Sequence, residues 1–381
     1  MVSSMLSVNL QNIQATQATA ENIWQTLQSL PEPLSGPAVT AGHKIYLLSA
    51  FDLFEYDTQT QSLTKKATMP TPRTDCGLAV VGYKIYTMGG RGTGPTNVNE
   101  VYDTITGMWE TKQSTIDYSL SQLIANTVNG KIYAIYAGGR YNGSTMIDTG
   151  SNIDVYDPET DNWTRISALH QEVPYLRASC AIDDKIYVIE DNTAATTIGE
   201  GKLHIYDTTT DAWSTGATLP TFYKNSRMVA TTGEHAPKQI YLVGGAIIQG
   251  IGDFEGVNTT FSYDPISDCW SRAADMPTAR QRAGVAFVDD KIYAIGGETG
   301  PGVSILDATP TSAVEVYTPF GYVTIQPSAS PSNGPESSQP VLPEATAVIA
   351  GAAIAGIAIA ATAILVYRHK HLKTAKQNKP N

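Results

Sequence analysis

The chain has 381 residues, enough for one large β domain or two average domains. Charged residues make up only 16%, and 20 tyrosines far outnumber 7 phenylalanines, a composition typical of short strands joined by turns. The net charge is −11, and because the last fourteen residues hold five basic side chains and no acidic one, the rest of the chain carries −16. Such an acidic body argues against nucleic acid as a partner.

The N-terminal segment lacks both the basic region and the apolar run of a secretory signal peptide, and we interpret residues 1–19 as a flexible N-terminus. Three scattered cysteines, Cys76, Cys180 and Cys269, form neither a disulfide framework nor a metal-binding pattern. We therefore predict that they are buried structural thiols, and we expect no cofactor.

From about residue 20 to 319 the chain repeats one phrase six times, at intervals of 40 to 54 residues. The copies are KIYLLSA (from 44), KIYTMGG (84), KIYAIYAGG (131), KIYVIED (185), QIYLVGG (239) and KIYAIGG (291). A short apolar run precedes each copy. A second phrase follows it, as in EVYDTITGMW (100–109), and in most copies ends in tryptophan.

Each unit is predicted to hold four strands: strand a in the apolar run, strand b in the IY phrase, strand c in the YD phrase and strand d at the tryptophan. The runs are apolar at consecutive positions, which indicates that both faces of each sheet are covered. Four-stranded antiparallel sheets repeated in this way are typical of a β-propeller. We predict that the glycines after strand b make room for aromatic rings of strands c and d, such as Tyr102 and Trp109.

The ends of the repeat region predict how the ring closes. The sixth unit stops after Tyr317 without a strand d, whereas the N-terminal ENIWQTLQSLPEP supplies an unassigned tryptophan, Trp24. A strand from the N-terminus that completes the last blade would remove two unpaired sheet edges. The fold class is therefore all-β, a six-bladed propeller closed by its N-terminal strand.

Beyond the propeller, residues 320–344 are rich in proline and serine and are interpreted as an extended stalk. Residues 345–367 carry no charge over 23 positions, which as a helix would extend about 34 Å and span a bilayer. The basic segment 368–381 follows. The positive-inside rule places it in the cytoplasm, with the propeller outside. The alternative is a tail-anchored protein whose propeller faces the cytosol.

The repeated units resemble the kelch repeat, with an apolar run that ends in Gly-Gly, then tyrosine, then tryptophan. The resemblance covers about 300 residues. Two units depart from it: the first has Ser49-Ala50 in place of Gly-Gly, and the fourth has Glu190-Asp191. The resemblance implies a six-bladed kelch propeller that binds its partner at one mouth of the central channel.

Strand a begins and strand b ends at the same rim of an antiparallel blade, so residues at these places are expected to surround that mouth. The candidate ligand-binding residues are Asp75, Arg91, Gln122, Arg140, Arg177, Asp191, Arg282 and Glu298. Ser35 and Arg227 are predicted on the same rim. Several arginines around one opening would form an anion site that grips carboxylates with two hydrogen bonds each.

Other roles for these residues stay open. Arginines near the start of strand a also suit a structural brace between blades, which we consider for Arg73, Arg177 and Arg280. Glu190-Asp191 marks either a functional departure or a degenerate blade.

Two classes of function remain. The first is a non-enzymatic recognition module for a protein or glycan. The second is an enzyme that resembles the sugar-acid mutarotases among kelch-like propellers, with charged residues of the mouth transferring protons. Some kelch-like propellers are copper radical oxidases, which need two histidine ligands at the mouth. We do not expect that activity here, because only His170 is expected near the mouth, whereas His43 and His235 fall in turns at the opposite rim. The roughly 20 residues before the ring are too few for the BTB or F-box domain of a ubiquitin-ligase adaptor.

Overall fold

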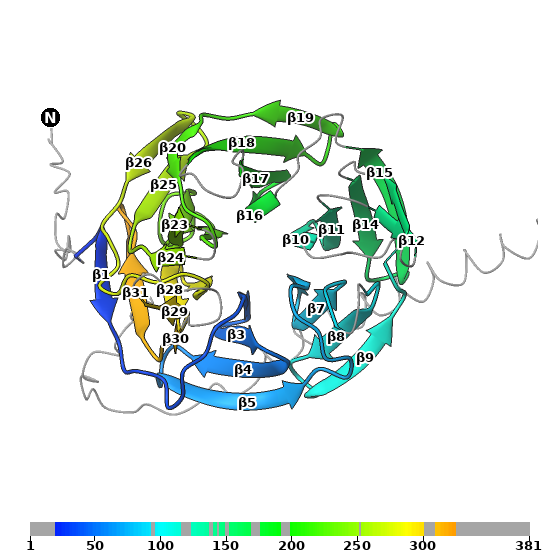
Figure 1. The fold of residues 1–381 in the computed structure, drawn as a ribbon, viewed down its shortest axis with the longest axis horizontal. Coiled ribbons are helices and arrows are strands. Elements are labelled where there is room, and N and C mark those ends of the chain that lie inside the picture. Colours follow the sequence, from blue (N-terminus) through cyan, green and yellow to red (C-terminus); the bar gives the residue numbers. More distant parts are fainter. Residues whose placement is uncertain are drawn as a thin grey trace, which may run out of the picture. The chain divides into compact units, whose positions relative to one another are not determined.

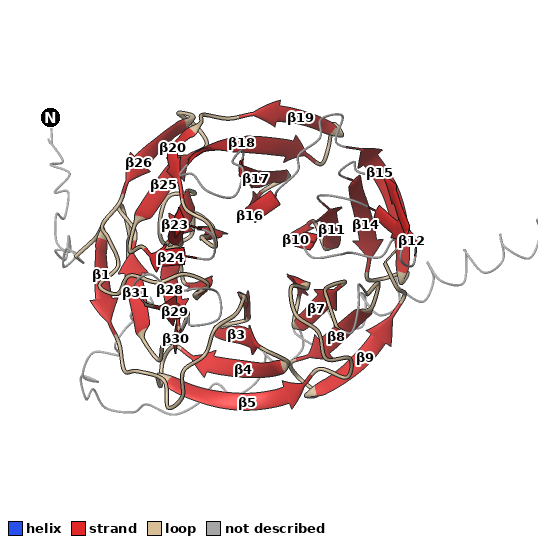
Figure 2. Ribbon diagram, in the orientation of Figure 1, coloured by secondary structure: helices blue, strands red, loops and turns tan. Residues whose placement is uncertain are grey.

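The structure is a computed structural model that describes residues 20–92, 96–115, 123–136, 140–142, 145–148, 152–168, 176–191, 199–250, 253–300 and 309–324. All regular elements among these residues are β-strands (Figure 2). No helix in this part of the chain is long and apolar enough to cross a membrane. The predicted membrane segment 345–367, the basic tail and nearly all of the predicted stalk lie outside the described residues.

Six sheets, each built from strands a, b, c and d, are arranged in a ring (Figure 1), as the repeats predict. Blade 1 consists of β2 (Ala38–Ala41), β3 (Lys44–Ser49), β4 (Asp52–Asp57) and β5 (Ser62–Thr68). Blade 2 consists of β6 (Gly77–Val81), β7 (Lys84–Met88), β8 (Asn99–Asp103) and β9 (Met108–Lys112). Blade 3 consists of β10 (Leu123–Val128), β11 (Lys131–Tyr136), β14 (Asn152–Asp157) and β15 (Asn162–Ala168).

The other three blades repeat this order of strands a, b, c and d. Blade 4 consists of β16 (Leu176–Ile182), β17 (Lys185–Asp191), β18 (Gly199–Asp207) and β19 (Ala212–Thr215), with β20 (Leu219–Phe222) paired to β18. Blade 5 consists of β21 (Arg227–Ala230), β22 (Ile240–Val243), β25 (Thr260–Asp264) and β26 (Cys269–Arg272). Blade 6 consists of β27 (Gly284–Val288), β28 (Lys291–Ile295), β31 (Val314–Thr318) and β1 (Ile23–Thr26).

Three short hairpins project from the connections between strands b and c. They are β12 (Arg140–Asn142) with β13 (Thr145–Asp148), β23 (Ala246–Gly250) with β24 (Asp253–Gly256), and β29 (Glu298–Thr299) with β30 (Thr309–Pro310).

The ring is closed by its own first strand, as predicted. β1 pairs antiparallel with β31, with Trp24 opposite Tyr317 (Figure 1). The Trp24 ring lies 5.3 Å from the Tyr317 ring, and the side chain is only 7% exposed. This pairing covers the free edge that β31 would otherwise present.

The strand-d tryptophans also join neighbouring blades. The Trp24 indole nitrogen donates a hydrogen bond to the carbonyl of Ala274, which follows strand d of blade 5. Trp270 donates in the same way to the Ala217 carbonyl of blade 4. Trp163 donates to the Gln113 carbonyl of blade 2. A repeated aromatic position therefore fixes one blade against the preceding one.

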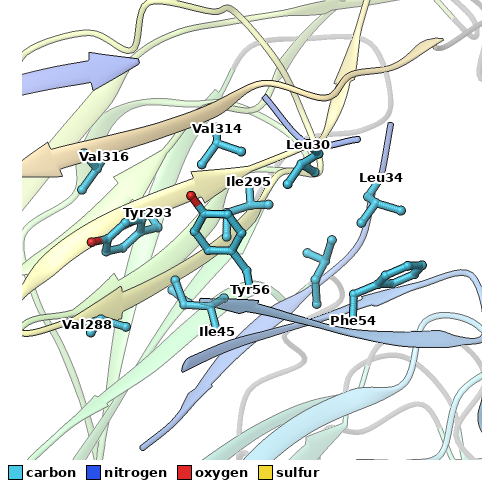
Figure 3. Packing of buried hydrophobic residues seen from close by; sticks show 12 residues of the cluster. Leu30, Leu34, Ile45, Phe54, Tyr56, Val288, Tyr293, Ile295, Val314 and Val316 are labelled. Atoms are coloured by element: carbon cyan, nitrogen blue, oxygen red, sulfur yellow. The ribbon is translucent and has the colours of Figure 1, made fainter. Parts of the chain in front are cut away.

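Each sheet packs against a neighbouring blade on both of its faces, and apolar side chains therefore fill the spaces between the blades. Figure 3 shows such a cluster between blades 6 and 1, where Ile45, Tyr56, Ile295 and Val314 are 0% exposed. Burying one such side chain contributes about 1.5–3 kcal/mol. The repeated IY and YD phrases therefore supply the buried residues of this core.

The reason for the Gly-Gly pairs differs from the prediction. Gly90 and Gly297 have φ of 97° and 105°, in a region that side chains with a Cβ rarely adopt. A Cβ at Gly90 would lie 2.6 Å from the Thr74 carbonyl oxygen, and one at Gly297 would lie 2.8 Å from that of Gln281. The pairs therefore make room for the backbone that leads into strand a, and the predicted role in seating aromatic rings is wrong.

The cysteine prediction is confirmed for two of three residues. Cys76 and Cys180 are buried, and burial raises the pKa of the Cys76 thiol to about 11. Cys269 is exposed, so the prediction was wrong there. It is the first residue of β26, where the side chain points outward while the adjacent Trp270 packs inward.

Candidate binding site

The backbone that leads into strand a has the same conformation in three blades. Asp75, Asn225 and Arg282 each stand two residues before strand a, with φ of 55°, 58° and 52°. Asparagine and aspartate adopt this left-handed region readily, whereas an arginine there costs roughly 1 kcal/mol. Arg282 therefore occupies this position although its left-handed backbone conformation is unfavourable.

The preceding residue in each blade pairs with the residue after the Gly-Gly position. The bridges join Thr74 to Arg91, Lys224 to Ala246 and Gln281 to Glu298. For Gln281 and Glu298 the two amides donate across the bridge at 3.0 and 2.8 Å. These bridges bring the start of strand a and the end of strand b to one rim, the mouth, as the antiparallel order requires.

A cavity of about 470 Å³ lies at this mouth. Its charged lining residues are Arg73, Asp75, Arg227, Arg282 and Glu298, and Ser35, Thr74 and Asn225 add neutral polar groups. They come from blades 1, 2, 5 and 6, so residues about 260 positions apart in the sequence meet in one cavity.

Hydrogen bonds organise one side of the cavity. The Ser35 hydroxyl donates to Glu298 Oε1 at 3.0 Å, and Arg282 Nη1 lies 3.5 Å from the same oxygen. The Asn225 amide donates to Gln281 Oε1 at 2.7 Å. The Arg282 side chain is 40% exposed and that of Glu298 only 13%, so the guanidinium is the more accessible charge.

Arg227 supplies a second, more enclosed cation. Burial lowers the pKa of its guanidinium, the Arg282 charge lowers it further, and Asp75 and Glu298 act in the opposite direction. An arginine nonetheless stays protonated at neutral pH. Among the described residues, Arg227 Nε and Glu298 Oε2 are buried atoms without a hydrogen-bond partner. Such atoms call for a water or ligand group that approaches them.

The predicted site residues fall into three sets. Asp75, Arg282 and Glu298 line the cavity together with Arg227 and Ser35. Arg91 is exposed, and its backbone bonds to Thr74 at the same rim. Gln122 and the side chains of Arg140, Arg177 and Asp191 lie outside the described residues. The backbones of these last three are in β12, β16 and β17.

Two arginines near this rim are braces, as considered from the sequence. Arg73 is 0% exposed, pairs with Glu100, and donates to the carbonyls of Gly89, Thr71 and Thr87. Arg280 is equally buried and pairs with Glu315 at 2.8 Å. These guanidiniums tie the lead-in of strand a to strands b and c of the same blade, not to the neighbouring one.

Blade 4 contains a buried pair of another kind. Glu190, in place of the first glycine, lies 2.8 Å from His204 of β18, and both side chains are less than 10% exposed. Without Gly-Gly the strand does not turn away, so β17 and β18 pair as far as Asp191 and Gly201. Glu190 therefore has a structural partner, which accounts for its departure from the repeat.

Asn225 was missed from the sequence. In blade 5 strand a does not begin with glycine, so the sequence assigned Arg227 to the rim position that Asp75 has in blade 2. In the structure, Arg227 pairs with Val243, just as Gly77 of blade 2 pairs with Met88. Arg227 is therefore equivalent to Gly77, and Asn225 is equivalent to Asp75. Counting back from the Gly-Gly pair through the hairpin register would have found Asn225.

Comparison with known proteins agrees with this construction. The model of the kelch motif matches residues 72–114 and 279–319, the two blades with the buried Arg–Glu brace. The molecule is a six-bladed β-propeller with two matched kelch motifs.

Similar curated proteins are themselves kelch-like. "Kelch-like protein terF" of Aspergillus terreus is 30% identical over 248 residues, which is 60% of this chain and 50% of that protein. "Kelch-like protein 26" of Danio rerio is 25% identical over 58% of this chain and 35% of its own length. "Kelch-like protein 25" of Xenopus tropicalis is 25% identical over 68% and 44%. The chain thus spans half or less of the length of these relatives.

The solved structure of YjhT is similar in fold. It aligns with a TM-score of 0.60 at 16% identity, covering 79% of this chain and 99% of YjhT. At this identity the likeness concerns the fold alone.

Proposed function

We propose that this propeller is a recognition module that binds a protein partner at its mouth, tethered to a membrane by residues 345–367. The mouth cavity carries the proposal. It places two guanidiniums, Arg227 and Arg282, beside two carboxylates, Asp75 and Glu298, in a hollow of about 470 Å³. A partner that inserts a side-chain carboxylate next to a hydrogen-bond donor would complement both charges.

Arg282 is the residue that we expect to contribute most. It is the accessible cation, and its backbone stays in a conformation that an asparagine would adopt at lower cost. Its link to Glu298 is long, at 3.5 Å, so a ligand carboxylate can compete for the guanidinium. Arginine is enriched among the residues that dominate protein interfaces.

The tether follows from the sequence after the propeller. Residues 345–367 carry no charge, and the basic residues 368–381 favour a cytoplasmic tail with the propeller on the other side. A tail-anchored chain with a cytosolic propeller is the alternative topology. Protease added to intact cells separates the two, because an outward-facing propeller is digested without permeabilising the membrane.

A random peptide library displayed on phage, selected on the detergent-solubilised full chain, tests recognition at the mouth. We expect the selected peptides to be acidic and to bind Arg282→Glu at least tenfold more weakly. Binding to the control Arg272→Glu should be unchanged, because Arg272 pairs with Asp275 at the outer edge of blade 5. Peptides that bind both variants equally would place recognition elsewhere.

A glycan array probed in parallel reports a carbohydrate ligand instead of a protein. Faster exchange of the anomers of a sialic acid, lost in Glu298→Gln, would contradict the recognition proposal in favour of catalysis.

A further inference from the structure

The face opposite the mouth exposes several large apolar side chains. This face, called the turn face, carries the turns between strands a and b and between strands c and d, the start of β1 and the end of β31. Its exposed apolar residues are Ile23, Tyr83, Ile105, Met108, Ile266, Phe320 and Val323. Ile105, Met108 and Ile266, at the c–d turns of blades 2 and 5, are 74%, 68% and 95% exposed. These two blades stand on opposite sides of the ring (Figure 1).

The chain also leaves the propeller on the turn face. After β31, the Tyr322 ring stacks on His235, which lies in the a–b turn of blade 5. The Val323 amide donates to the His235 carbonyl at 2.7 Å, and Lys291 lies over the Tyr322 ring. The Gly321 amide donates to Glu21 beside β1. These contacts hold residues 321–323 at this face.

The length of the following segment limits the distance to the predicted membrane segment. Twenty residues, 325–344, separate the last described residue from position 345. As the extended stalk that the sequence predicts, at ~3.1 Å per residue, this segment would reach at most roughly 60 Å. Tethering at such distances corresponds to millimolar effective concentrations. A weakly apolar face would therefore contact the bilayer for much of the time.

Charge on the turn face selects the kind of lipid. Lysines at the start of strand b are engaged by aspartates at the end of strand c, as Lys44 is by Asp57 and Lys131 by Asp157. One further lysine of this face, Lys238, is engaged by Asp183. Additional acidic residues in the a–b and c–d turns, such as Asp184 and Glu159, leave the face net acidic. An acidic face is repelled by anionic headgroups and is compatible with zwitterionic ones.

We propose that the turn face docks on a bilayer of zwitterionic lipids, with its apolar turn tips in the headgroup region and the mouth directed toward solvent. This inference rests on the membrane tether of the proposed function. Partial insertion of apolar side chains at turn tips is the same interfacial binding that amphipathic segments use.

Quenching by spin-labelled lipid tests the docking. Cys269 lies at the start of strand d on the turn face and is exposed, whereas Cys76 and Cys180 are buried, so one native thiol can carry a fluorophore. The full chain is incorporated into phosphatidylcholine nanodiscs that contain doxyl-labelled lipid. The matched probe on the mouth is Phe51→Cys in a Cys269→Ser background, because Phe51 is 40% exposed in the b–c turn of blade 1.

We expect quenching at Cys269 and little at the mouth probe. Ile105→Asp combined with Met108→Asp should lower the ratio of docked to undocked propeller on the order of tenfold, or about 1.4 kcal/mol. The control Phe51→Asp should leave it unchanged. Phosphatidylserine in the disc should weaken quenching at Cys269.

Three results would overturn the inference. Equal quenching at both probes, in a chain that resists alkaline extraction from vesicles, would refute docking while the tether stands. Stronger quenching with phosphatidylserine would refute the choice of zwitterionic lipid. A chain that alkali extracts would refute the tether and the docking that rests on it.

Discussion

Replacement of Trp24 by alanine tests whether the N-terminal strand closes the propeller. The side chain is 7% exposed, contacts the Tyr317 ring at 5.3 Å, and donates to the Ala274 carbonyl at 3.0 Å. Truncation of a buried aromatic side chain of this kind costs about 3–5 kcal/mol of unfolding free energy. Trp24→Phe keeps most of the apolar contact but loses the donor, and should cost about 1–2 kcal/mol.

Urea denaturation followed by circular dichroism measures the loss, and hydrogen exchange locates it. In Trp24→Ala the amides of β31 (Val314–Thr318) should exchange faster, because β1 no longer covers that edge. The control is Trp163→Ala, the same position in blade 3, whose indole donates to Gln113 at 2.8 Å. It should also destabilise the protein but leave exchange in β31 unchanged.

The reasoning about closure would be refuted by a Trp24→Ala protein that loses less than about 1 kcal/mol and keeps slow exchange in β31. That result would mean that β31 is protected without the N-terminal strand.

Three further predictions concern braces, thiols and acid. Glu100→Gln should destabilise by about 3–5 kcal/mol because it leaves Arg73 buried without its countercharge. The control Glu110→Gln, which removes the exposed partner of Lys112, should cost less than about 1 kcal/mol, and equal losses in denaturation would contradict the importance of the buried pair. Ellman's reagent should titrate one thiol, Cys269, in the native protein and three in urea, and a second fast thiol in the native state would contradict the burial. Hydrogen bonds from Lys44 and from backbone amides lower the pKa of Asp57 to about 2, and those from the Thr209 hydroxyl and from backbone amides lower that of Asp207 to about 2. Since both pKa values lie below the ordinary 3.8, these carboxylates stabilise the fold above about pH 4 and lose that contribution as the pH falls toward 2. Over this pH range the melting temperature of Asp207→Asn should fall less than that of the unsubstituted protein. An equal fall in melting temperature for the two proteins would refute this.

Repeated residues made the propeller predictable. Each IY and YD phrase packs between blades in the same way, so six copies indicate six sheets. The unpaired tryptophan at the start and the missing one at the end identified the closure, since a sheet edge without a partner is unfavourable.

At the mouth, the sequence placed Arg282 on the rim and left Arg280 open between a brace and a ligand contact, and the structure distinguishes their environments. Arg280 is fully buried against Glu315, while Arg282, two residues later, turns toward the cavity. The difference arises from the left-handed backbone at Arg282, which depends on the bridge between Gln281 and Glu298. A bridge of that kind is a tertiary contact and leaves no local pattern in the sequence.

The sequence by itself determined the strand order, the number of blades and the closing strand, because these depend on apolar burial that repeats with the chain. The sequence also placed Asp75, Arg227, Arg282 and Glu298 on one rim. Only the tertiary structure decided that Ser35 donates to Glu298 there, that Glu190 pairs with His204, and that residues 321–323 are held at the face opposite the mouth. Those arrangements depend on how the blades close around the ring and on backbone conformations set by contacts between distant segments. The pattern of neighbouring residues in the sequence does not reveal these contacts.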